Sequence, residues 1–178
     1  MSPSLRIFAY SLGASIVFYQ CHSYLGTVVY CEGISMEPTI HHGDYLLVEK
    51  FSLYRGRIKR GDIVVAKQPR GPRTHCHILK RVRAIGGEPV VYWSPKLAKP
   101  VTAYVPEKHV WLEGDNQLHS LDSRTYGSVP LGRLEYRVFC RLWPITSFGK
   151  FDKEPRVWGN TTTIKRSSEV SAFQDDDR

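Results

Sequence analysis

The sequence predicts one mostly β domain that follows an uncharged N-terminal segment. The 178 residues are enough for one hydrophobic core, and a hydrophobic fraction of 42 % with 12 % aromatic residues is typical of a folded chain. From residue 43 onward, short apolar or alternating runs are separated by glycine-containing turns, as expected of β-strands. No stretch after residue 35 has the apolar spacing of a long amphipathic helix.

The first element is the stretch from Ile7 to Cys31, which carries no charged residue. At about 1.5 Å per residue, a helix of this length would extend roughly 37 Å, which suffices for a tilted membrane crossing. We therefore expect a transmembrane helix, a membrane anchor over residues 7–31. Gln20 and His22 interrupt the apolar run, so a cleaved signal peptide and an amphipathic helix lying on the membrane remain as alternatives.

The charges on either side of this segment predict its orientation. Arg6 precedes it, whereas acidic residues follow it and no lysine or arginine occurs before Lys50. By the positive-inside rule, this asymmetry favours an inner N-terminus and a translocated domain.

The body of the domain, residues 32–150, is predicted from runs with a period of two. The expected strands are Tyr45 to Glu49, Asp62 to Lys67, His77 to Ile85, Val90 to Trp93, His109 to Glu113 and Leu134 to Trp143. The segments Gln68 to Cys76 and Ser94 to Pro106 are rich in turn formers and are predicted to be irregular. Residues 151–178 form a C-terminal tail, predicted to be disordered from Asn160 onward.

Net charge and cysteines leave several functions open. The formal charge of +8 fits an anionic membrane surface, nucleic acid or acidic substrates equally well. Cys21, Cys31, Cys76 and Cys140 form no C-x-x-C pair, so neither a zinc ribbon nor a redox motif is indicated. We expect free thiols, with a bridge between Cys76 and Cys140 in an oxidising compartment as the alternative.

A serine and a lysine are the first candidates for chemistry. Ser35 stands just after the uncharged segment, and a serine needs a neighbouring base to become a nucleophile. On the expected strand, Lys80 shares one face with Ile78, Val82 and Ala84, and burial in such an apolar row would lower its pKa towards neutrality. Each residue alone also fits a structural role, Lys80 as a surface-reaching lysine and Ser35 as a turn or helix-capping residue.

A third segment, from Glu113 to Gly127, is dense in turn formers and hydrogen-bonding side chains directly after an apolar strand. With it, the chain resembles the type I signal peptidases over about residues 31 to 127. The matching motifs, in the family's order, are Ser35-Met36-Glu37-Pro38-Thr39, Gly43-Asp44 with its following strand, Lys80-Arg81-Val82 leading to Gly86-Gly87-Glu88, and Gly114-Asp115-Asn116 with Ser120, Asp122, Ser123 and Arg124. One motif alone is weak, but four in the right order are specific.

The resemblance implies a signal-peptidase-like β-fold and a serine-lysine endopeptidase that needs neither metal nor organic cofactor. Ser35 would be the nucleophile and Lys80 the general base. Ser120 matches the serine that hydrogen-bonds the lysine, and Met36 matches a position that contributes to the substrate-binding surface. A supporting ion pair is matched by Asp122 and Arg124.

One position departs from the family pattern. Bacterial members commonly carry a hydroxyl residue two positions before the nucleophile to help bind the oxyanion, whereas this chain has Gly33. The oxyanion would then rest on the backbone N–H of Ser35 and on a compensating group that the sequence does not identify.

Within the family, the short domain and the run from Val105 to Asn116 are most similar to the mitochondrial inner membrane peptidases. The intact Asp122-Ser123-Arg124 and the ending from Trp143 to Gly149 are more similar to their subunit 1 than to subunit 2. This resemblance implies an enzyme that removes sorting presequences from precursor proteins. It also implies anchorage in the lipid bilayer of the mitochondrial inner membrane, a catalytic domain in the intermembrane space, and a heterodimer with a second peptidase subunit.

Two related serine-lysine proteins are the main alternatives. One is a bacterial-type signal peptidase I in another compartment. The other is a self-cleaving, DNA-binding repressor, to which the basic run Arg55 to Arg60 and the side chains of Arg81 and Arg83 would contribute. Because the chain has a hydrophobic segment where such a repressor has a helix-turn-helix domain, we expect no nucleic acid partner and interpret the basic face as solvated or in contact with anionic lipid.

Other classes are less well supported. A Ser-His-Asp hydrolase lacks its G-x-S-x-G motif here. A zinc site built on His75-Cys76-His77 and His41-His42 lacks a further ligand pair at suitable spacing. A catalytically silent membrane scaffold is disfavoured because every expected catalytic side chain is present.

Overall fold

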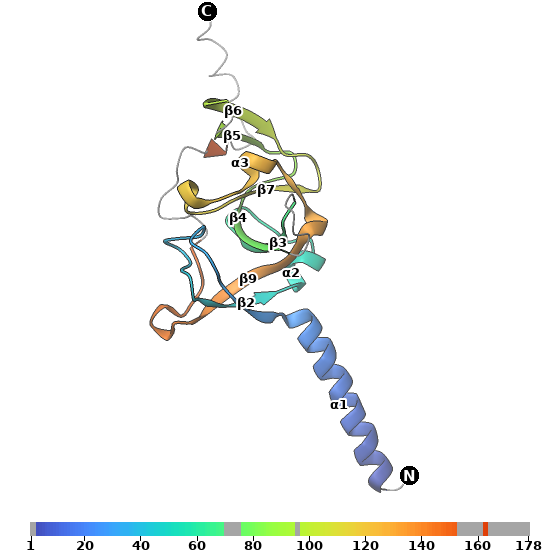
Figure 1. Ribbon diagram of the computed structural model, residues 1–178. Helices are drawn as coiled ribbons and strands as arrows, with labels where there is room; N and C mark the ends of the chain where they lie inside the picture. Colours follow the sequence, from blue (N-terminus) through green and yellow to red (C-terminus); the bar gives the residue numbers. More distant parts are fainter. Residues whose placement is uncertain (1–2, 70–75, 95–96, 153–161, 164–178) are drawn as a thin grey trace, which may run out of the picture.

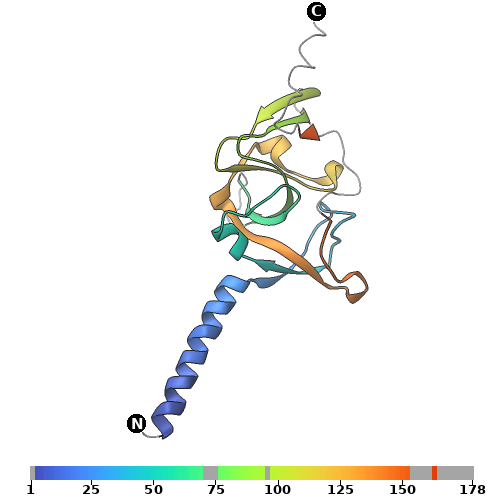
Figure 2. The same cartoon turned by 180° about the vertical axis from the view of Figure 1, so that it is seen from behind.

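The computed structural model describes residues 3–69, 76–94, 97–152 and 162–163. A long N-terminal helix, α1 (Pro3–Leu25), projects from a β domain and stands clear of it in both views (Figures 1 and 2). The mostly β fold predicted from the sequence is confirmed.

The larger sheet has the order β1-β2-β9-β3-β4-β7-β8, and neighbouring strands are antiparallel throughout. Its strands are β1 (Thr27–Tyr30), β2 (Tyr45–Glu49), β9 (Leu134–Trp143), β3 (Ile63–Lys67), β4 (His77–Ile85), β7 (His109–Glu113) and β8 (Val129–Pro130). A smaller sheet has the order β10-β5-β6, formed by β10 (Thr162–Thr163), β5 (Pro89–Ser94) and β6 (Lys99–Tyr104).

Short helical turns connect the strands. They are α2 (Phe51–Tyr54), α3 (Ser123–Tyr126), and the single 3-10 turns η1 (Gln117–His119), η2 (Leu131–Arg133) and η3 (Ile145–Ser147). The turns η1 and α3 follow β7 and lie within the segment from Glu113 to Gly127, which is dense in turn formers.

The central strand β3 is buried on both faces, because the larger sheet curls around it (Figure 1). Ile63 and Val65 belong to one core cluster, together with Leu46 and Val48 of β2. Val64 and Ala66 belong to a second cluster with Val82 of β4 and Leu112 of β7. A strand covered on both sides is a continuous apolar run, and Ile63 to Ala66 is such a run.

The expected strands are all present, with ends that agree to within one residue. Two strands lie where irregular structure was expected. The strand β6 lies inside the predicted loop Ser94 to Pro106, at the edge of its sheet, where Pro100 is tolerated. The strand β10 lies inside the predicted disordered tail and pairs with Val90 and Val91. The rest of that tail beyond Asp152, and residues 70–75 of the other predicted loop, lie outside the described residues.

The N-terminal segment was expected to be one helix as far as Cys31, but the helix ends earlier. The helix ends at Leu25 because Gly26 has a φ of +108° and lies against the backbone of β2. The chain then continues as β1, which pairs with β2 from Thr27 opposite Val48 to Tyr30 opposite Tyr45. Among the described residues, no helix combines the length and the apolar character that a membrane crossing requires.

The thiols of Cys31, Cys76 and Cys140 are free. The alternative of a bridge between Cys76 and Cys140 is therefore wrong. Burial raises the pKa of the Cys31 thiol to about 12, so it is protonated at neutral pH.

Candidate active site

The loop from Cys31 to Asp44 joins β1 to β2 and carries Ser35. Its two ends are held together, since Cys31 N donates to Asp44 O and Gly43 N donates to Cys31 O, each at 2.9 Å. Within the loop, Met36 and Ile40 insert into the core cluster beneath it. The fold therefore fixes the backbone on both sides of the serine.

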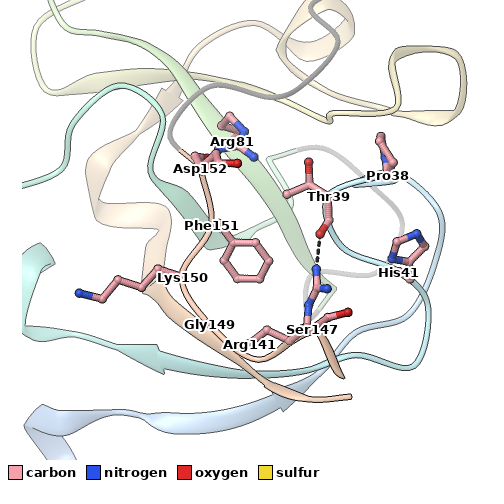
Figure 3. Close-up of a pocket in the computed structure, with 10 residues that line it drawn as sticks. All are labelled: Pro38, Thr39, His41, Arg81, Arg141, Ser147, Gly149, Lys150, Phe151 and Asp152. Atoms are coloured by element: carbon pink, nitrogen blue, oxygen red, sulfur yellow. Dashed lines mark hydrogen bonds between the residues drawn. The ribbon is translucent and has the colours of Figure 1, made fainter. Parts of the chain in front are cut away.

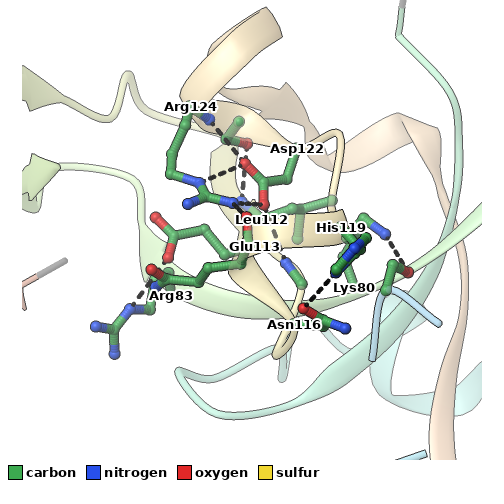
Figure 4. Close-up of polar contacts among 12 residues, drawn as sticks. Lys80, Arg83, Leu112, Glu113, Asn116, His119, Asp122 and Arg124 are labelled. Atoms are coloured by element: carbon green, nitrogen blue, oxygen red, sulfur yellow. Dashed lines mark hydrogen bonds and ion pairs between the residues drawn. The ribbon is translucent and has the colours of Figure 1, made fainter. Parts of the chain in front are cut away.

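Lys80 lies in β4, and its Nζ is 2.7 Å from Ser35 Oγ (Figure 4). The side chain is buried, with only 4 % of the residue exposed. This burial lowers the pKa of Lys80 to about 8, although the negative charges of Asp122 and Asp115 oppose the shift. The geometry places a hydroxyl beside an amine that is partly neutral near physiological pH, which is the arrangement needed to activate a nucleophile.

Beyond β7, Gly114 packs against both Ser35 and Ser120. A Cβ at this position would lie 2.4 Å from Ser35 O and 2.3 Å from Ser120 Oγ, so only glycine permits the close approach. Ser120 Oγ is buried and makes no hydrogen bond within the described residues. The expected hydrogen bond from Ser120 to the lysine is therefore not formed, and the Lys80 amine contacts Ser35 instead.

Asp122 and Arg124 form an ion pair at the start of α3 (Figure 4). The Asp122 carboxylate is fully buried and accepts hydrogen bonds from Arg124 Nε, Nη2 and the backbone N–H, at 2.9, 2.9 and 3.2 Å. It also accepts from Gly114 N at 3.3 Å. The same carboxylate thus caps α3 and holds the glycine that packs against Ser35.

Arg81 and Arg83 were expected to form a solvated or lipid-facing surface, and this expectation is wrong. They are 1 % and 6 % exposed. Arg81 forms an ion pair with Asp115 at 2.7 Å, and Arg83 lies 3.6 Å from Glu113. Because β7 pairs with β4 and places Glu113 opposite Arg81, Glu113 at the end of β7 and Asp115 just after it lie close enough to neutralise both guanidinium groups.

Met36 is 3 % exposed and belongs to the core, yet it also lines a small cavity beside the Ser35–Lys80 pair. The cavity has a volume of about 150 Å³, and Cys31, Ile78 and Leu79 are among its other walls. Its small volume fits a small side chain.

A larger cavity of about 440 Å³ is lined in part by Pro38, Thr39 and His41 of the serine loop (Figure 3). Arg141 of β9 reaches into it, pairs with Asp44 at 3.0 Å and donates a hydrogen bond to Thr39 O. Arg81 also lines this cavity and donates to Asp152 O at 2.7 Å. The two contacts of Arg141 hold Thr39 and Asp44 of the loop, and the sequence offered no signal for this role of Arg141.

Three further residues touch the site. Asn116 donates through its side chain to Ile34 O at 3.1 Å and through its backbone to Ser35 O at 3.0 Å. His42 Nδ1 accepts from Gly33 N at 3.3 Å. Gly33 has a φ of +96°, a conformation that favours glycine, so a hydroxyl residue at this position would be strained.

No metal-binding cluster of three or more His, Cys, Asp or Glu residues is found in the part of the chain that the structure describes. His77 instead contacts Glu135, with Nε2 and Oε2 2.6 Å apart. His75 lies outside the described residues.

The chain is similar to known peptidases over most of its length. It is 39 % identical to the mitochondrial inner membrane protease subunit 1 of Homo sapiens over 155 residues, which are 87 % of this chain and 92 % of that protein. The subunit 1 of Xenopus tropicalis is 41 % identical over the same shares of the two chains. A subunit 2, from Schizosaccharomyces pombe, is 34 % identical over 73 % of this chain and 70 % of that protein.

Among solved structures, a signal peptidase I from Enterococcus faecalis matches with a TM-score of 0.37 and 22 % identity, over 44 % of this chain and 94 % of that one. The sequence model described as "Signal peptidase, peptidase S26" matches residues 4–98 and 94–143, which include Ser35, Lys80 and the segment after β7. The chain therefore belongs to the peptidase S26 family of signal peptidases.

Proposed function

We propose that this protein is a membrane-bound serine endopeptidase in which Ser35 is the nucleophile and Lys80 the general base. The observation that carries the proposal is the 2.7 Å contact between Ser35 Oγ and the buried Lys80 Nζ. As Oγ attacks the carbonyl carbon of the scissile peptide, Lys80 accepts the hydroxyl proton. The carbonyl oxygen becomes an oxyanion, for which the Ser35 N–H is a donor.

Lys80 serves both halves of the reaction. When the tetrahedral intermediate collapses, the ammonium of Lys80 protonates the leaving amine, and an ester remains on Ser35. The neutral amine then takes a proton from the water that hydrolyses the ester. Arginine could not replace Lys80 here, because its guanidinium stays protonated.

The activity should follow the protonation of Lys80. Below a pKa of about 8 the amine is charged and cannot accept the Ser35 proton, so kcat/KM should rise about tenfold per pH unit and level off above pH 8. The measurement is kcat/KM between pH 6 and 10. An acidic limb with an inflection near pH 4, typical of a carboxylate base, would contradict the assignment.

Asp122, Arg124 and Ser120 support the site without taking part in bond making. The ion pair fixes the segment after β7, and Gly114 at its start presses against the Ser35 backbone. Met36 contributes to the binding surface for the substrate residue next to the scissile bond, because it lines the cavity beside Ser35. The small volume of that cavity favours a small side chain there.

The substrates are precursor proteins from which a sorting or signal presequence is removed. Relatives that align with most of this chain are named mitochondrial inner membrane proteases, which supports the same membrane for this protein. The catalytic domain would face the intermembrane space, since Arg6 lies in the first turn of α1 and acidic residues follow the helix.

Attachment to the bilayer would occur through α1. Its exposed side chains include Ile7, Phe8, Leu12, Ile16 and Val17, and Arg6 is the one charged residue in the helix. The strand that follows continues this apolar character on its outer face, where the ring of Tyr30 contacts that of Tyr45, with ring centres 5.2 Å apart. Tyr45 in turn lies opposite an exposed Trp143 of β9. Aromatic side chains of this kind are typical of the membrane interface.

A second peptidase subunit of the same family is the proposed partner. The relatives include proteins named subunit 1, at up to 41 % identity, and proteins named subunit 2, at 34 and 36 %. We assign this chain the role of subunit 1 in such a heterodimer.

The experiment replaces the native gene with one that encodes Ser35→Ala. Precursors of intermembrane-space proteins should accumulate with their presequences intact, and N-terminal sequencing of these precursors would identify the cleavage sites. Ser128 lies outside the site, between α3 and β8, so Ser128→Ala is the control and should process normally. Normal processing in the Ser35→Ala strain would refute the proposed function.

A further inference from the structure

Asn116 ties the nucleophile loop to the segment after β7 through two hydrogen bonds. Its side-chain Nδ2 donates to Ile34 O at 3.1 Å, and its backbone N–H donates to Ser35 O at 3.0 Å. These two carbonyls belong to the peptide units on either side of the Ser35 Cα. One residue therefore fixes both planes that meet at the nucleophile.

The contact to Ile34 O also determines where the Ser35 N–H points. In a trans peptide, the carbonyl oxygen and the following N–H lie in one plane and point in opposite directions. Ile34 O accepts a second hydrogen bond from Glu37 N at 3.2 Å, so both of its lone pairs are engaged. With the oxygen held from two sides, the Ser35 N–H has a fixed direction.

That N–H is available for a ligand. Within the described residues, Ser35 N donates to no other group, in contrast to Glu37 N, Thr39 N and Ile40 N of the same loop. Gly33 supplies no hydroxyl that would share the oxyanion. The aim of this single backbone donor therefore matters more here than in a site with two donors.

We propose that Asn116 is a positioning residue that aims the Ser35 N–H at the oxyanion of the transition state. The inference rests on the proposed function. His119 assists, since its Nδ1 lies 3.3 Å from Asn116 Oδ1. With hydrogen on Nδ1, the imidazole donates to Oδ1 and turns the Asn116 amide nitrogen towards Ile34 O.

The test uses purified full-length protein in detergent and a fluorogenic peptide that spans a cleavage site mapped in the Ser35→Ala strain. Asn116→Ala removes the side-chain donor, and Asn116→Asp keeps its shape but cannot donate to Ile34 O. Both should lower kcat by about ten- to hundredfold and leave KM unchanged, because oxyanion contacts form only in the transition state. The neighbouring Gln117→Ala is the control and should retain wild-type kcat.

The pH profile separates positioning from a general structural defect. Asn116 does not contact Lys80, so the apparent pKa of kcat/KM should stay at its wild-type value in the uncharged Asn116→Ala variant. In Asn116→Asp the added carboxylate should raise this pKa, as Asp115 and Asp122 do, so that variant tests only kcat at high pH and KM. Wild-type kcat in Asn116→Ala and Asn116→Asp would overturn the inference, as would a raised KM or unfolding of both variants, or a shifted pKa in Asn116→Ala. Lack of peptide cleavage by wild type and Gln117→Ala alike would instead refute the proposed function.

Discussion

Replacing Lys80 by methionine is expected to lower kcat/KM by about 10⁴-fold or more, the size of effect seen when a base that acts together with its nucleophile is removed. Methionine keeps most of the side-chain volume but cannot accept the Ser35 proton. The site is 4 % exposed and disfavours a charge, so an apolar side chain should leave the melting temperature of the protein unchanged or higher. The measurement combines steady-state peptide cleavage with thermal unfolding.

Two controls make this result specific to Lys80. Lys67→Met removes a lysine from the neighbouring strand β3, whose side chain is 54 % exposed and pairs with Glu135, and it should retain wild-type activity. Lys80→Arg keeps a positive charge without a usable base and should be as inactive as Lys80→Met. Native activity in Lys80→Met, or an equal loss in Lys67→Met, would contradict the role of Lys80.

Replacing Asp122 by alanine should have the largest effect on stability, lowering the free energy of unfolding by about 3–5 kcal/mol. The carboxylate is fully buried and accepts from three N–H groups of Arg124 and from Gly114 N. Its loss leaves the Arg124 guanidinium without its partner and frees the start of α3. Denaturant unfolding in detergent is the measurement.

The matched control is Glu135→Ala, which removes a carboxylate from the exposed pair with Lys67. That change should cost about 1 kcal/mol or less, because solvent screens such pairs. If Asp122→Ala unfolds at the same denaturant concentration as the wild type, the ion pair does not hold the segment after β7.

The sequence predicted the strands well because most of them alternate or are bounded by glycine turns. It predicted Lys80 on an apolar row for the same reason, and the burial of Val82 and Ala84 agrees. Arg81 and Arg83 were assigned to a solvated face because period-two reasoning assumes that one face of a strand meets water. Their partners Asp115 and Glu113 lie about thirty residues further along the chain, so no local pattern reveals the buried pairs.

Other features depended on contacts that only the folded chain provides. The helix ends at Leu25 because Gly26 must approach the backbone of β2, and this approach cannot be inferred from the apolar run itself. The edge strand β6 escaped prediction because Pro100 and Lys99 are unfavourable in most strands. Asn116 was visible in the motif Gly114-Asp115-Asn116, but its hydrogen bonds to Ile34 and Ser35 were not.

The measurement that tests the central claim most directly is a double-mutant comparison of kcat/KM for Ser35→Ala, Lys80→Met and the variant that carries both changes. If the two side chains act as one catalytic unit, each single change removes the whole contribution of the pair, and the double variant should be no slower than either single variant. The three values should then agree, each about 10⁴-fold or more below the wild type. Losses that multiply in the double variant, or native activity in either single variant, would contradict a Ser35–Lys80 dyad.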